Sequence, residues 1–546
     1  ENRRGRVWTA VIRATMNCRM VDYANELNVE QLAVVHNGDG HCLVLAGAGS
    51  GKTRAITYRV AYLLEKGVAP ENILLVTFTN KAAREMIERV QALTSGDPPL
   101  TPPHKGGESI TLPWSGTFHH IGYRILKQYA SLLGHKNNFS ILDSDDSVGL
   151  LKLCLKQEGI PRAARRFPSP KVLQSIISYT RNAQTTIEDV LGLQHPQWLS
   201  IADDIRRIGL DYQQRKKDAN AMDFDDLLVN THLLLSKSEK VRKKYSEQFQ
   251  YVLVDEYQDT NKIQASIIKL FASHHKNILV VGDDAQSIYS FRAADIQNIL
   301  DFSAKGGFAS GGGGYPDAKI FYLTTNYRST PDILQVANQV IAANINQYSK
   351  ELKSVVSPFV KPEVREFADL REEAQFIAER ILELRNEGVP LEEIAVLFRA
   401  AFHSQALEIE LTKRDIPYDY RGGVRFFERA HIKDVLAHLR VFANIEDTVA
   451  WRRVLTMQVG IGSASVEQII GAIHTLSVIP SEAIGEVEES LDKNALDMES
   501  LRQIGTYLST RAQVGFGDFL QIWRGLEKAD HTPSALIRAV IESKYR

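Results

Sequence analysis

Cysteine is scarce in this chain of 546 residues: only Cys18, Cys42 and Cys154 occur, and no two of them form a CxxC pair. This scarcity argues against a disulfide framework and a cysteine-based zinc site, and we expect a reducing, cytoplasmic location. An excess of charge is lacking as well, since the formal net charge is −1. Without a general basic surface, any surface for nucleic acid must be a local groove.

Long hydrophobic runs are also missing, since none approaches the roughly 18 apolar residues of a membrane-spanning helix. Hydrophobic residues make up 44% and charged residues 24% of the chain, as in globular proteins. The length predicts about three or four domains. The first residues are rich in Arg and lack the apolar core of a signal peptide, so we expect 1–26 to be a leader or an unstructured segment.

Four short apolar runs are typical of strands that are buried on both faces of a parallel sheet, since each is short and none alternates with polar residues. The runs are Cys42–Leu45, Ile73–Phe78, Tyr251–Val254 and Ile278–Val281. Polar, glycine or carboxylate residues follow each run at once. Because ligands bind beyond the carboxyl ends of such strands, we expect the four segments to converge on one site.

The first run leads into AGAGSGKT, which departs from the GxxxxGK[ST] pattern only at its first position. A strand, a glycine-rich turn and a helix N-terminus together present backbone N–H groups to a polyphosphate. In this pattern the lysine neutralises the β- and γ-phosphates and the threonine hydroxyl ligates Mg²⁺, so we predict that ATP and Mg²⁺ bind here. The expected loop residues are Ala46, Gly47, Ala48, Gly49, Ser50, Gly51, Lys52 and Thr53.

The third run ends in two adjacent carboxylates, Asp255 and Glu256. ATP hydrolysis needs a cation that neutralises the developing phosphate charge and a water molecule that is aligned for attack. We predict that Asp255 holds Mg²⁺, mostly through water, and that Glu256 positions and deprotonates the attacking water. Two such acids can also be solvated or cap a helix, but beside a phosphate loop they favour an ATPase.

Seven segments occur in the order found in the UvrD/PcrA/Rep family of superfamily 1 DNA helicases, which the chain resembles from about Leu27 to its end. They are AGAGSGKT, TFTNKAAREM, GTFHHIGYRIL, MDFDDLL, VDEYQDTN, VGDDAQSIYSFR and LTTNYRS. The resemblance implies an α/β fold with two P-loop RecA-like parallel-sheet motor domains, each carrying an inserted helical domain. It implies an ATP-dependent 3′→5′ DNA helicase or translocase that moves on single-stranded DNA in DNA repair or replication. The implied partners are single-stranded DNA and single-strand/duplex junctions, with no membrane.

The expected domain boundaries follow from the patterns and the resemblance. We expect the first motor domain at 27–121 and 222–302, its helical insertion at 122–221, a Gly-rich loop at 303–317, an incomplete second motor domain at 318–421 and its insertion at 422–546. Within the second motor domain we expect strands at Lys319–Leu323 and Ile394–Phe398 and helices at Thr330–Asn344 and Glu372–Asn386. Two segments, Asp97–Pro113 and Ser303–Pro316, are predicted to be flexible loops.

The resemblance also assigns nucleotide contacts. Gln31 would read adenine, since a carboxamide can donate and accept at once. Tyr327 resembles the residue that stacks on the base, and Arg328 would contact the γ-phosphate from the second motor domain as an arginine finger does. Gln286 would sense the γ-phosphate from the first motor domain, and Arg54 would flank the nucleotide. Tyr327 could instead be a packed aromatic residue and Arg54 a surface cation.

Aromatic residues that follow the sheet ends are candidates for DNA binding. Phe78, Tyr289 and Phe291 could stack on bases, which contributes about 1–3 kcal/mol per base, or could belong to the core. The resemblance favours Phe78 and Phe291 as DNA contacts, and Phe291 stands where the family commonly has Trp. Expected DNA contacts nearby are Thr79, Asn80, Thr117, His119 and Arg292. The pair His119–His120 has no further ligand motif and does not predict a zinc site.

Three further features allow two interpretations each. The basic clusters Arg162–Arg166 and Arg215–Lys217 could contact phosphate or form solvated helix faces. The segment Val459–Ile469 offers a glycine turn that could hold a duplex phosphate or simply join two helices.

Two later segments of the family, one like HxxKGLE and one like VxxTRA, do not occur before Arg546. In the family they close the second motor domain and supply a second arginine near the γ-phosphate, and losing such a contact costs about 10³–10⁵ in rate. We therefore expect a C-terminally truncated chain that is inactive or turns ATP over poorly. The alternative function is a nucleotide-gated fragment that binds single-stranded DNA without productive turnover. Whether a nuclease domain follows stays open.

Overall fold

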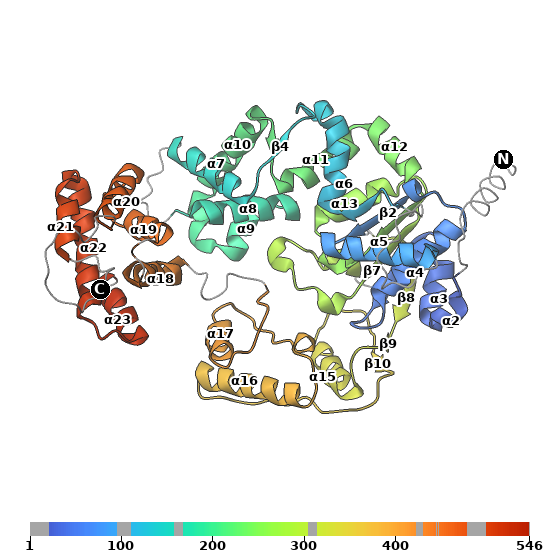
Figure 1. The fold of residues 1–546 in the computed structure, drawn as a ribbon. Helices are drawn as coiled ribbons and strands as arrows, with labels where there is room; N and C mark the ends of the chain where they lie inside the picture. The colour runs from blue at the N-terminus through green and yellow to red at the C-terminus, as the bar shows by residue number, and fades with distance from the viewer. Residues whose placement is uncertain are drawn as a thin grey trace. The chain divides into compact units, whose positions relative to one another are not determined.

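The computed structural model divides into two compact units, Glu1–Glu363 and Val364–Arg546, which are described separately (Figure 1). The structure describes residues 21–95, 111–157, 167–303, 314–421, 430–443, 445, 447–477 and 498–544. The predicted loops Asp97–Pro113 and Ser303–Pro316 lie largely outside the described residues. Most of the predicted leader 1–26 also lies outside them; its described part contains helix α2, Tyr23–Glu26, and the buried Val21.

Unit 1 is built on a six-stranded parallel sheet of order β3-β2-β6-β7-β1-β8. Its strands are β1 His41–Ala46, β2 Ile73–Thr77, β3 Ser115–Thr117, β6 Tyr251–Val254, β7 Ile278–Gly282 and β8 Lys319–Leu323. The four strands predicted from apolar runs are confirmed as β1, β2, β6 and β7. Their central position matches their composition, because every residue of β2 and β7 is buried.

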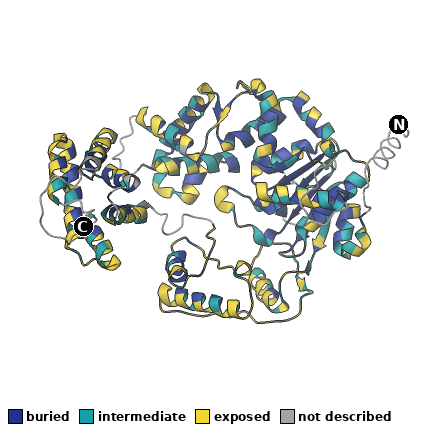
Figure 2. Ribbon diagram, viewed as in Figure 1, coloured by how far each residue is buried: buried dark blue, intermediate teal, exposed yellow. Residues whose placement is uncertain are grey.

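Side chains of successive residues in each strand face opposite layers of helices, and the strands are buried between these layers (Figure 2). One layer packs on Leu43 and Leu45; its helices are α6 Phe118–Tyr129, α11 Phe224–Lys237, α12 Glu239–Gln248, α13 Lys262–Phe271 and α14 Gln297–Leu300. The other packs on Cys42 and Val44; its helices are α3 Val29–Asn37, α4 Lys52–Glu65 and α5 Asn80–Ser95. This three-layer arrangement confirms the predicted α/β class.

The strand β8 corrects one prediction. We expected Lys319–Leu323 to open a second α/β unit, but it pairs in parallel with β1, from Cys42 opposite Lys319 to Ala46 opposite Leu323. Leu323 is buried in the same cluster as Val44. The backbone groups along that side of β1 require hydrogen-bond partners, and β8 supplies them. The segment that follows β8 therefore leaves the sheet beside the end of β1.

The segment predicted to be a helical insertion is helical in the structure. Its helices are α7 Ser144–Gln157, α8 Pro170–Ala183, α9 Ile187–Gln194 and α10 Ala202–Asp218, and they enclose a core of their own around Leu173 and Ile205. Two short parallel strands, β4 Ser140–Ile141 and β5 Ala221–Met222, lie at its base. The predicted boundary at 122 falls inside α6, whose buried residues pack on the sheet. The basic cluster Arg162–Arg166 lies outside the described residues.

Beyond β8, the chain of unit 1 forms two short parallel strands and one helix. These are β9 Thr325–Asn326, α15 Pro331–Ile341 and β10 Lys353–Ser354. The predicted helix Thr330–Asn344 is thereby confirmed as α15.

The described residues of unit 2 contain helices and no strand. They form α16 Leu370–Asn386, α17 Ser404–Lys413, α18 Ala430–Ala443, α19 Thr448–Thr456, α20 Ser463–Ser477, α21 Met498–Thr506, α22 Thr510–Lys528 and α23 Pro533–Lys544. The predicted helix Glu372–Asn386 is confirmed as α16. The predicted strand Ile394–Phe398 is wrong: Leu397 is 93% exposed, and no described strand of this unit is available to pair with it. Val459–Ile469 contains the turn before α20, with Gly460 at a φ of 90°, and the first residues of α20.

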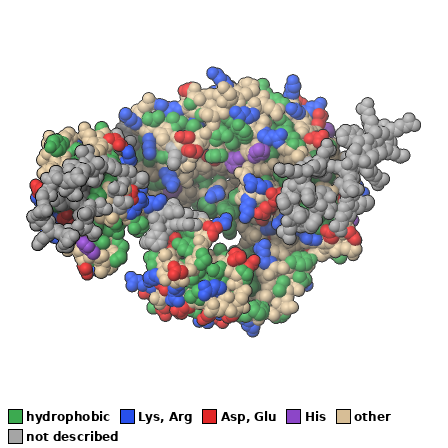
Figure 3. Space-filling view, in the orientation of Figure 1, with side chains coloured by type: hydrophobic (Ala, Val, Ile, Leu, Met, Phe, Trp, Pro, Cys, Tyr) green, Lys and Arg blue, Asp and Glu red, His purple; other side chains and the backbone are tan. Residues whose placement is uncertain are grey.

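Basic and acidic side chains are interspersed over the face of the molecule drawn in Figure 3. This mixture agrees with the net charge of −1. Among the described helices, none has both the length and the apolar character needed to cross a membrane.

Candidate functional site

The loop between β1 and α4 has the conformation that its glycines predict. Gly49 and Gly51 have φ angles of 72° and 86°, the left-handed region that other residues rarely adopt. The hydroxyl of Ser50 donates to the carbonyl of Gly47 at 2.8 Å and holds the turn. Helix α4 begins at Lys52, so the unpaired N–H groups of its first turn face the loop. This arrangement suits a polyphosphate.

Lys52, Glu256 and Gln286 come from three separate segments and meet at this loop. The Nζ of Lys52 lies 3.0 Å from Oε2 of Glu256 and 3.3 Å from Oε1 of Gln286. Glu256 follows β6 with a φ of 50°, which is uncommon for a residue other than glycine. Because β6, β7 and β1 are neighbours in the sheet, their carboxyl ends bring together three of the five residues that the sequence predicts to act in ATP hydrolysis.

Asp255 is only 6% exposed, and its Oδ1 accepts no hydrogen bond. Burial, and then the adjacent charge of Glu256, raise the pKa of Asp255 to about 7. A buried carboxylate oxygen without a donor fits a divalent cation, which would supply the missing positive charge. The described residues contain no group of three or more possible metal ligands, but Mg²⁺ usually takes one or two carboxylates together with water and phosphate oxygens.

Gln258, which the sequence analysis does not single out, joins Glu256 to the segment that carries Gln286. Its Nε2 donates to Oε2 of Glu256 at 2.8 Å, and its Oε1 accepts from the backbone N–H of Asp283 at 3.0 Å. The bridge passes directly over Gly282, where a Cβ atom would lie 2.5 Å from Oε1 of Gln258. Only glycine leaves room for this contact.

The segment that leaves β8 packs against the phosphate loop. The backbone N–H of Tyr327 donates to the carbonyl of Gly49 at 3.0 Å, and the Tyr327 hydroxyl accepts from Nδ2 of Asn28 at 2.7 Å. Arg328 follows, and it is exposed beside the loop. The resemblance placed Arg328 on a second motor domain; here it lies in unit 1, directly after the edge strand of the first sheet.

Gln31 and Arg54 both lie beside Gly51 of the loop. Gln31 is buried, with its Nε2 donating to the carbonyl of Ser50 at 3.1 Å. Arg54 is exposed, with its guanidinium donating to the carbonyl of Glu26 at 2.7 Å and lying 4.8 Å from the centre of the Tyr58 ring. The predicted roles of both residues in nucleotide binding stay predictions.

A pocket of about 580 Å³ lies beyond the carboxyl ends of β2 and β3. Seven of the eight predicted DNA contacts line it: Phe78, Thr79, Thr117, His119, Tyr289, Phe291 and Arg292. The eighth, Asn80, begins α5 and is not among the lining residues. The opposite wall comes from α8 of the helical insertion, through Ser175, Ser178, Tyr179 and Asn182. The sequence analysis missed this wall because polar residues on a helix carry no recognisable motif.

Three aromatic rings form one side of the pocket. The ring centres of Phe78 and Tyr289 are 5.0 Å apart, and those of Tyr289 and Phe291 are 5.9 Å apart. Phe291 is 68% exposed, and the Arg292 guanidinium lies 5.6 Å from each of the last two rings. Burial outweighs the nearby Asp225 and lowers the pKa of His119, so this histidine is neutral at physiological pH. A row of aromatic rings that ends in an exposed ring beside a cation suits stacked bases.

Two carboxylates also line the pocket, Asp225 and Asp259. Asp259 is buried, and its Oδ1 accepts no hydrogen bond. Burial, and then the charge of Glu256, raise the pKa of Asp259 to about 6. Carboxylates repel phosphate groups, so this wall suits the N–H groups of base edges better than a sugar–phosphate backbone.

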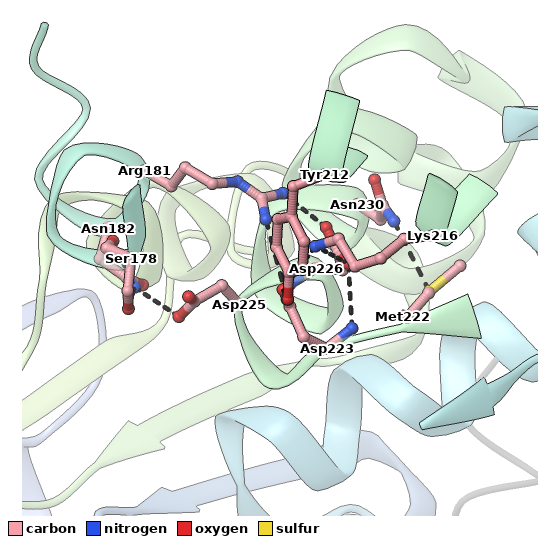
Figure 4. Close-up of polar contacts among 10 residues, drawn as sticks. All are labelled: Ser178, Arg181, Asn182, Tyr212, Lys216, Met222, Asp223, Asp225, Asp226 and Asn230. Carbon is pink, nitrogen blue, oxygen red and sulfur yellow. Dashed lines mark hydrogen bonds and ion pairs between the residues drawn. The ribbon is translucent and has the colours of Figure 1, made fainter. Parts of the chain in front are cut away.

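A buried ionic network supports the pocket from behind (Figure 4). Lys216 of α10 pairs with Asp223 and with Asp226, the latter at 2.6 Å, and Arg181 of α8 lies 2.6 Å from Asp226. Burial would raise the pKa of Asp226, but Arg181 and Lys216 outweigh it and lower that pKa. The basic cluster Arg215–Lys217 is therefore partly an internal ion pair rather than a phosphate contact.

Asn182 connects the helical insertion to the sheet domain. Nδ2 of Asn182 donates to Asp225 at 2.6 Å, and Oδ1 of Asn182 accepts from Nδ2 of Asn261 at 3.0 Å. Asn261 caps α13 and directly follows Thr260, the last residue of the segment VDEYQDT that carries Asp255 and Glu256. The helical insertion and the sheet domain are thus joined at the rim of the pocket.

Comparisons with known proteins show which helicase sequences the chain is similar to. Residues 27–306 match the UvrD/REP helicase N-terminal domain, and residues 321–495 match the UvrD-like helicase C-terminal domain. The ATP-dependent DNA helicase PcrA of Staphylococcus epidermidis is 39% identical over 467 residues, and that of Staphylococcus aureus strain Mu50 is 38% identical over 469 residues. Each alignment covers 85% of this chain, and the chain spans 60% of the length of these relatives.

Proposed function

Since this chain belongs to the UvrD/REP helicase family, we propose that it is an ATP-dependent DNA helicase that moves 3′→5′ along single-stranded DNA. The observation that carries the proposal is the convergence of Lys52, Glu256 and Gln286 on a phosphate loop, beside a pocket lined with three aromatic rings. The direction of movement and the role in repair or replication rest on the resemblance of the sequence motifs.

The residues at the loop divide the work of ATP hydrolysis. Lys52 and the N–H groups of the loop bind the phosphates, and Glu256 orients and deprotonates the attacking water. Asp255 and the Thr53 hydroxyl would hold Mg²⁺, which neutralises negative charge that develops on the phosphates. Gln286 contacts Lys52 directly and is placed to respond to the γ-phosphate. Tyr327, Gln31, Arg54 and Arg328 border the same loop and are proposed contacts of the nucleotide.

The pocket is the proposed path of the single strand. Phe78, Tyr289 and Phe291 offer ring faces that stack on bases of any sequence, as motion along DNA requires. The same turn carries both sites, because Glu256 contacts Lys52 while Asp259 lines the pocket. Because Glu256 and Asp259 are three residues apart, a movement of Glu256 on nucleotide binding or hydrolysis is transmitted to the DNA path at Asp259.

The proposed domain division keeps the first motor domain at 27–121 and 222–302 and extends it by β8, with the insertion between α6 and α11. The segment 324–421 remains the proposed second motor domain, and 422–546 its helical insertion. Single-strand/duplex junctions are the proposed substrate.

The decisive experiment measures ATP hydrolysis by the chain with and without single-stranded DNA, beside the Glu256→Gln variant. We expect turnover that DNA stimulates and that Glu256→Gln abolishes while nucleotide and DNA affinity are kept. A wild-type chain that binds ATP and DNA without turnover would instead support the alternative of a nucleotide-gated DNA-binding fragment. Normal hydrolysis by Glu256→Gln would remove Glu256 from its proposed role.

A further inference from the structure

A segment far from the phosphate loop in sequence, 348–354, lies directly against the nucleotide site. The backbone N–H of Tyr348 donates to Oδ2 of Asp284 at 3.0 Å, and its hydroxyl donates to the carbonyl of Leu300. At the other end, the backbone N–H of Lys353 donates to the carbonyl of Thr324 at 3.0 Å. Between them, Leu352 covers Gly47, where a Cβ atom would lie 2.2 Å from the Leu352 side chain.

Lys350 in this segment is a buried cation. Its side chain is 7% exposed, and its Nζ lies 3.0 Å from Oδ1 of Asp283 and also pairs with Asp284. Burial would lower the pKa of Lys350, but the two carboxylates outweigh burial and raise it, so the ammonium group stays charged. Two adjacent buried carboxylates need such a cation, because uncompensated buried charge is strongly unfavourable.

The contacts continue from Lys350 to the phosphate-binding lysine. The other oxygen of Asp283, Oδ2, accepts from Nε2 of Gln286 at 2.6 Å. This bond orients the carboxamide so that its Oε1 points to Lys52, 3.3 Å from Nζ. Lys350 and Lys52 are thus joined through one carboxylate and one carboxamide.

We propose that Lys350 is a positioning residue for the γ-phosphate: by holding Asp283, it fixes the orientation of Gln286 at the nucleotide. The inference rests on the proposed function, because it assigns Lys350 a role in the same ATP site. Lys350 contacts Asp283 and Asp284, and its effect on the nucleotide site passes through Asp283 to Gln286. It also ties the site to the segment that follows α15, so the position of this segment and the recognition of the γ-phosphate depend on each other.

The test compares two dissociation constants in the full chain, one for the β,γ-imido analogue of ATP and one for ADP, each with Mg²⁺. We expect Lys350→Met to weaken binding of the analogue about tenfold and to leave ADP binding unchanged, as loss of an outer-shell partner does at other sites. Lys350→Arg keeps the charge and should restore most of the difference. The matched control is Lys353→Met, which removes an exposed lysine of the same segment and should change neither constant.

A double-variant cycle separates positioning from general support of the fold. If Lys350 acts through Gln286, Lys350→Met should have no further effect on the analogue in a Gln286→Ala background. An equal loss in both backgrounds, or an unchanged ratio of the two constants in Lys350→Met, would overturn the inference. If Lys350→Met does not fold, Lys350→Met/Asp284→Asn keeps the net charge of the cluster and should show the same selective loss; a wild-type ratio there would also overturn it.

Failure of the proposed function gives a different result. A wild-type chain that binds neither the analogue nor ADP would overturn the ATP site and this inference together. A chain that binds both ligands, and whose preference does not respond to Lys350, would overturn the inference alone.

Discussion

Two lysines of unit 1, Lys52 and Lys216, both pair with carboxylates, yet they differ in the hydrogen bonding of the nearby acids and in their exposure. Around Lys216, all four oxygens of Asp223 and Asp226 accept a hydrogen bond from the protein. Around Lys52, the nearby Asp255 has a buried oxygen that accepts none. The side chain of Lys52 is also more open, at 11% exposure against 2% for Lys216.

The difference separates a supporting network from a binding site. When the protein supplies all partners of a buried charge, removing one partner leaves the others uncompensated and lowers the stability of the fold. A group with an unfilled hydrogen-bonding position has capacity for a ligand. The AGAGSGKT pattern marks Lys52 in the sequence, but no pattern shows that the acids near Lys216 are fully paired while an oxygen of Asp255 is not.

The largest expected effect is on stability, at Lys216. Lys216→Met leaves Asp223 and Asp226 buried with only Arg181 as a cation, and breaking a buried pair in this way costs about 3–5 kcal/mol. Denaturant unfolding would measure the loss. Lys217→Met, on the exposed side of the same helix, is the control and should change stability by less than about 0.5 kcal/mol. Equal effects of the two substitutions would break the comparison.

Lys52 should behave in the opposite way. Lys52→Met removes a preorganised cation from the phosphates, so DNA-stimulated ATP turnover should fall at least about 10²-fold. Its effect on unfolding free energy should stay within about 1 kcal/mol, because Glu256 is one-third exposed and can be hydrated. Steady-state hydrolysis and a denaturation curve on the same preparation give both numbers. A large loss of stability would place Lys52 with the supporting network.

The unfilled oxygen of Asp255 predicts a pH effect. The pKa of Asp255 is raised to about 7 in the folded chain, so ionisation of this group destabilises the fold as pH rises from about 4 through 7. Asp255→Asn does not ionise, and its advantage in unfolding free energy should grow by about 2–3 kcal/mol between pH 5 and pH 8 in the absence of Mg²⁺. A constant difference over this range would show that the site already satisfies the carboxylate.

Phe291 extends the comparison to an apolar side chain that is largely exposed. Phe291→Ala should weaken single-stranded DNA binding about 5- to 100-fold, the effect of one lost stack, and leave stability and ATP affinity unchanged. Phe291→Trp should bind DNA more tightly than the wild type, because its ring face is larger. Fluorescence anisotropy with a labelled oligonucleotide measures both variants. An unchanged isotherm for Phe291→Ala would exclude the ring from the DNA path.

Local sequence patterns correctly predicted the strands whose own residues determine their place in the sheet. The runs at β1, β2, β6 and β7 are apolar without alternation, and each ends in the polar residues of the site. Since parallel strands end at the same edge, the meeting of Lys52, Glu256 and Gln286 followed from the strand assignment alone. The seven pocket residues were found because the resemblance supplied motifs that surround them.

The missed features depend on contacts between distant segments. Whether Lys319–Leu323 joins β1 or starts another sheet depends on which edge is free, and the residues of the strand do not encode that choice. Asn182 and Lys350 are single polar residues in helical or irregular segments, where most such residues are solvated. Their importance comes from burial and from partners more than sixty positions away, which no local pattern records.

The close approach of Gln258 to Gly282 limits how the sequence can change over time. A strand that is buried on both faces would ordinarily accept alanine or valine at its end, but at 282 either side chain would displace the Gln258 carboxamide. A smaller residue at 258 would make room and would give up the link to Asp283. A substitution at position 258 or at position 282 alone therefore removes the hydrogen bonds of Gln258 that bridge Glu256 and Asp283. Among functional variants in a library, substitutions at positions 258 and 282 should therefore occur together.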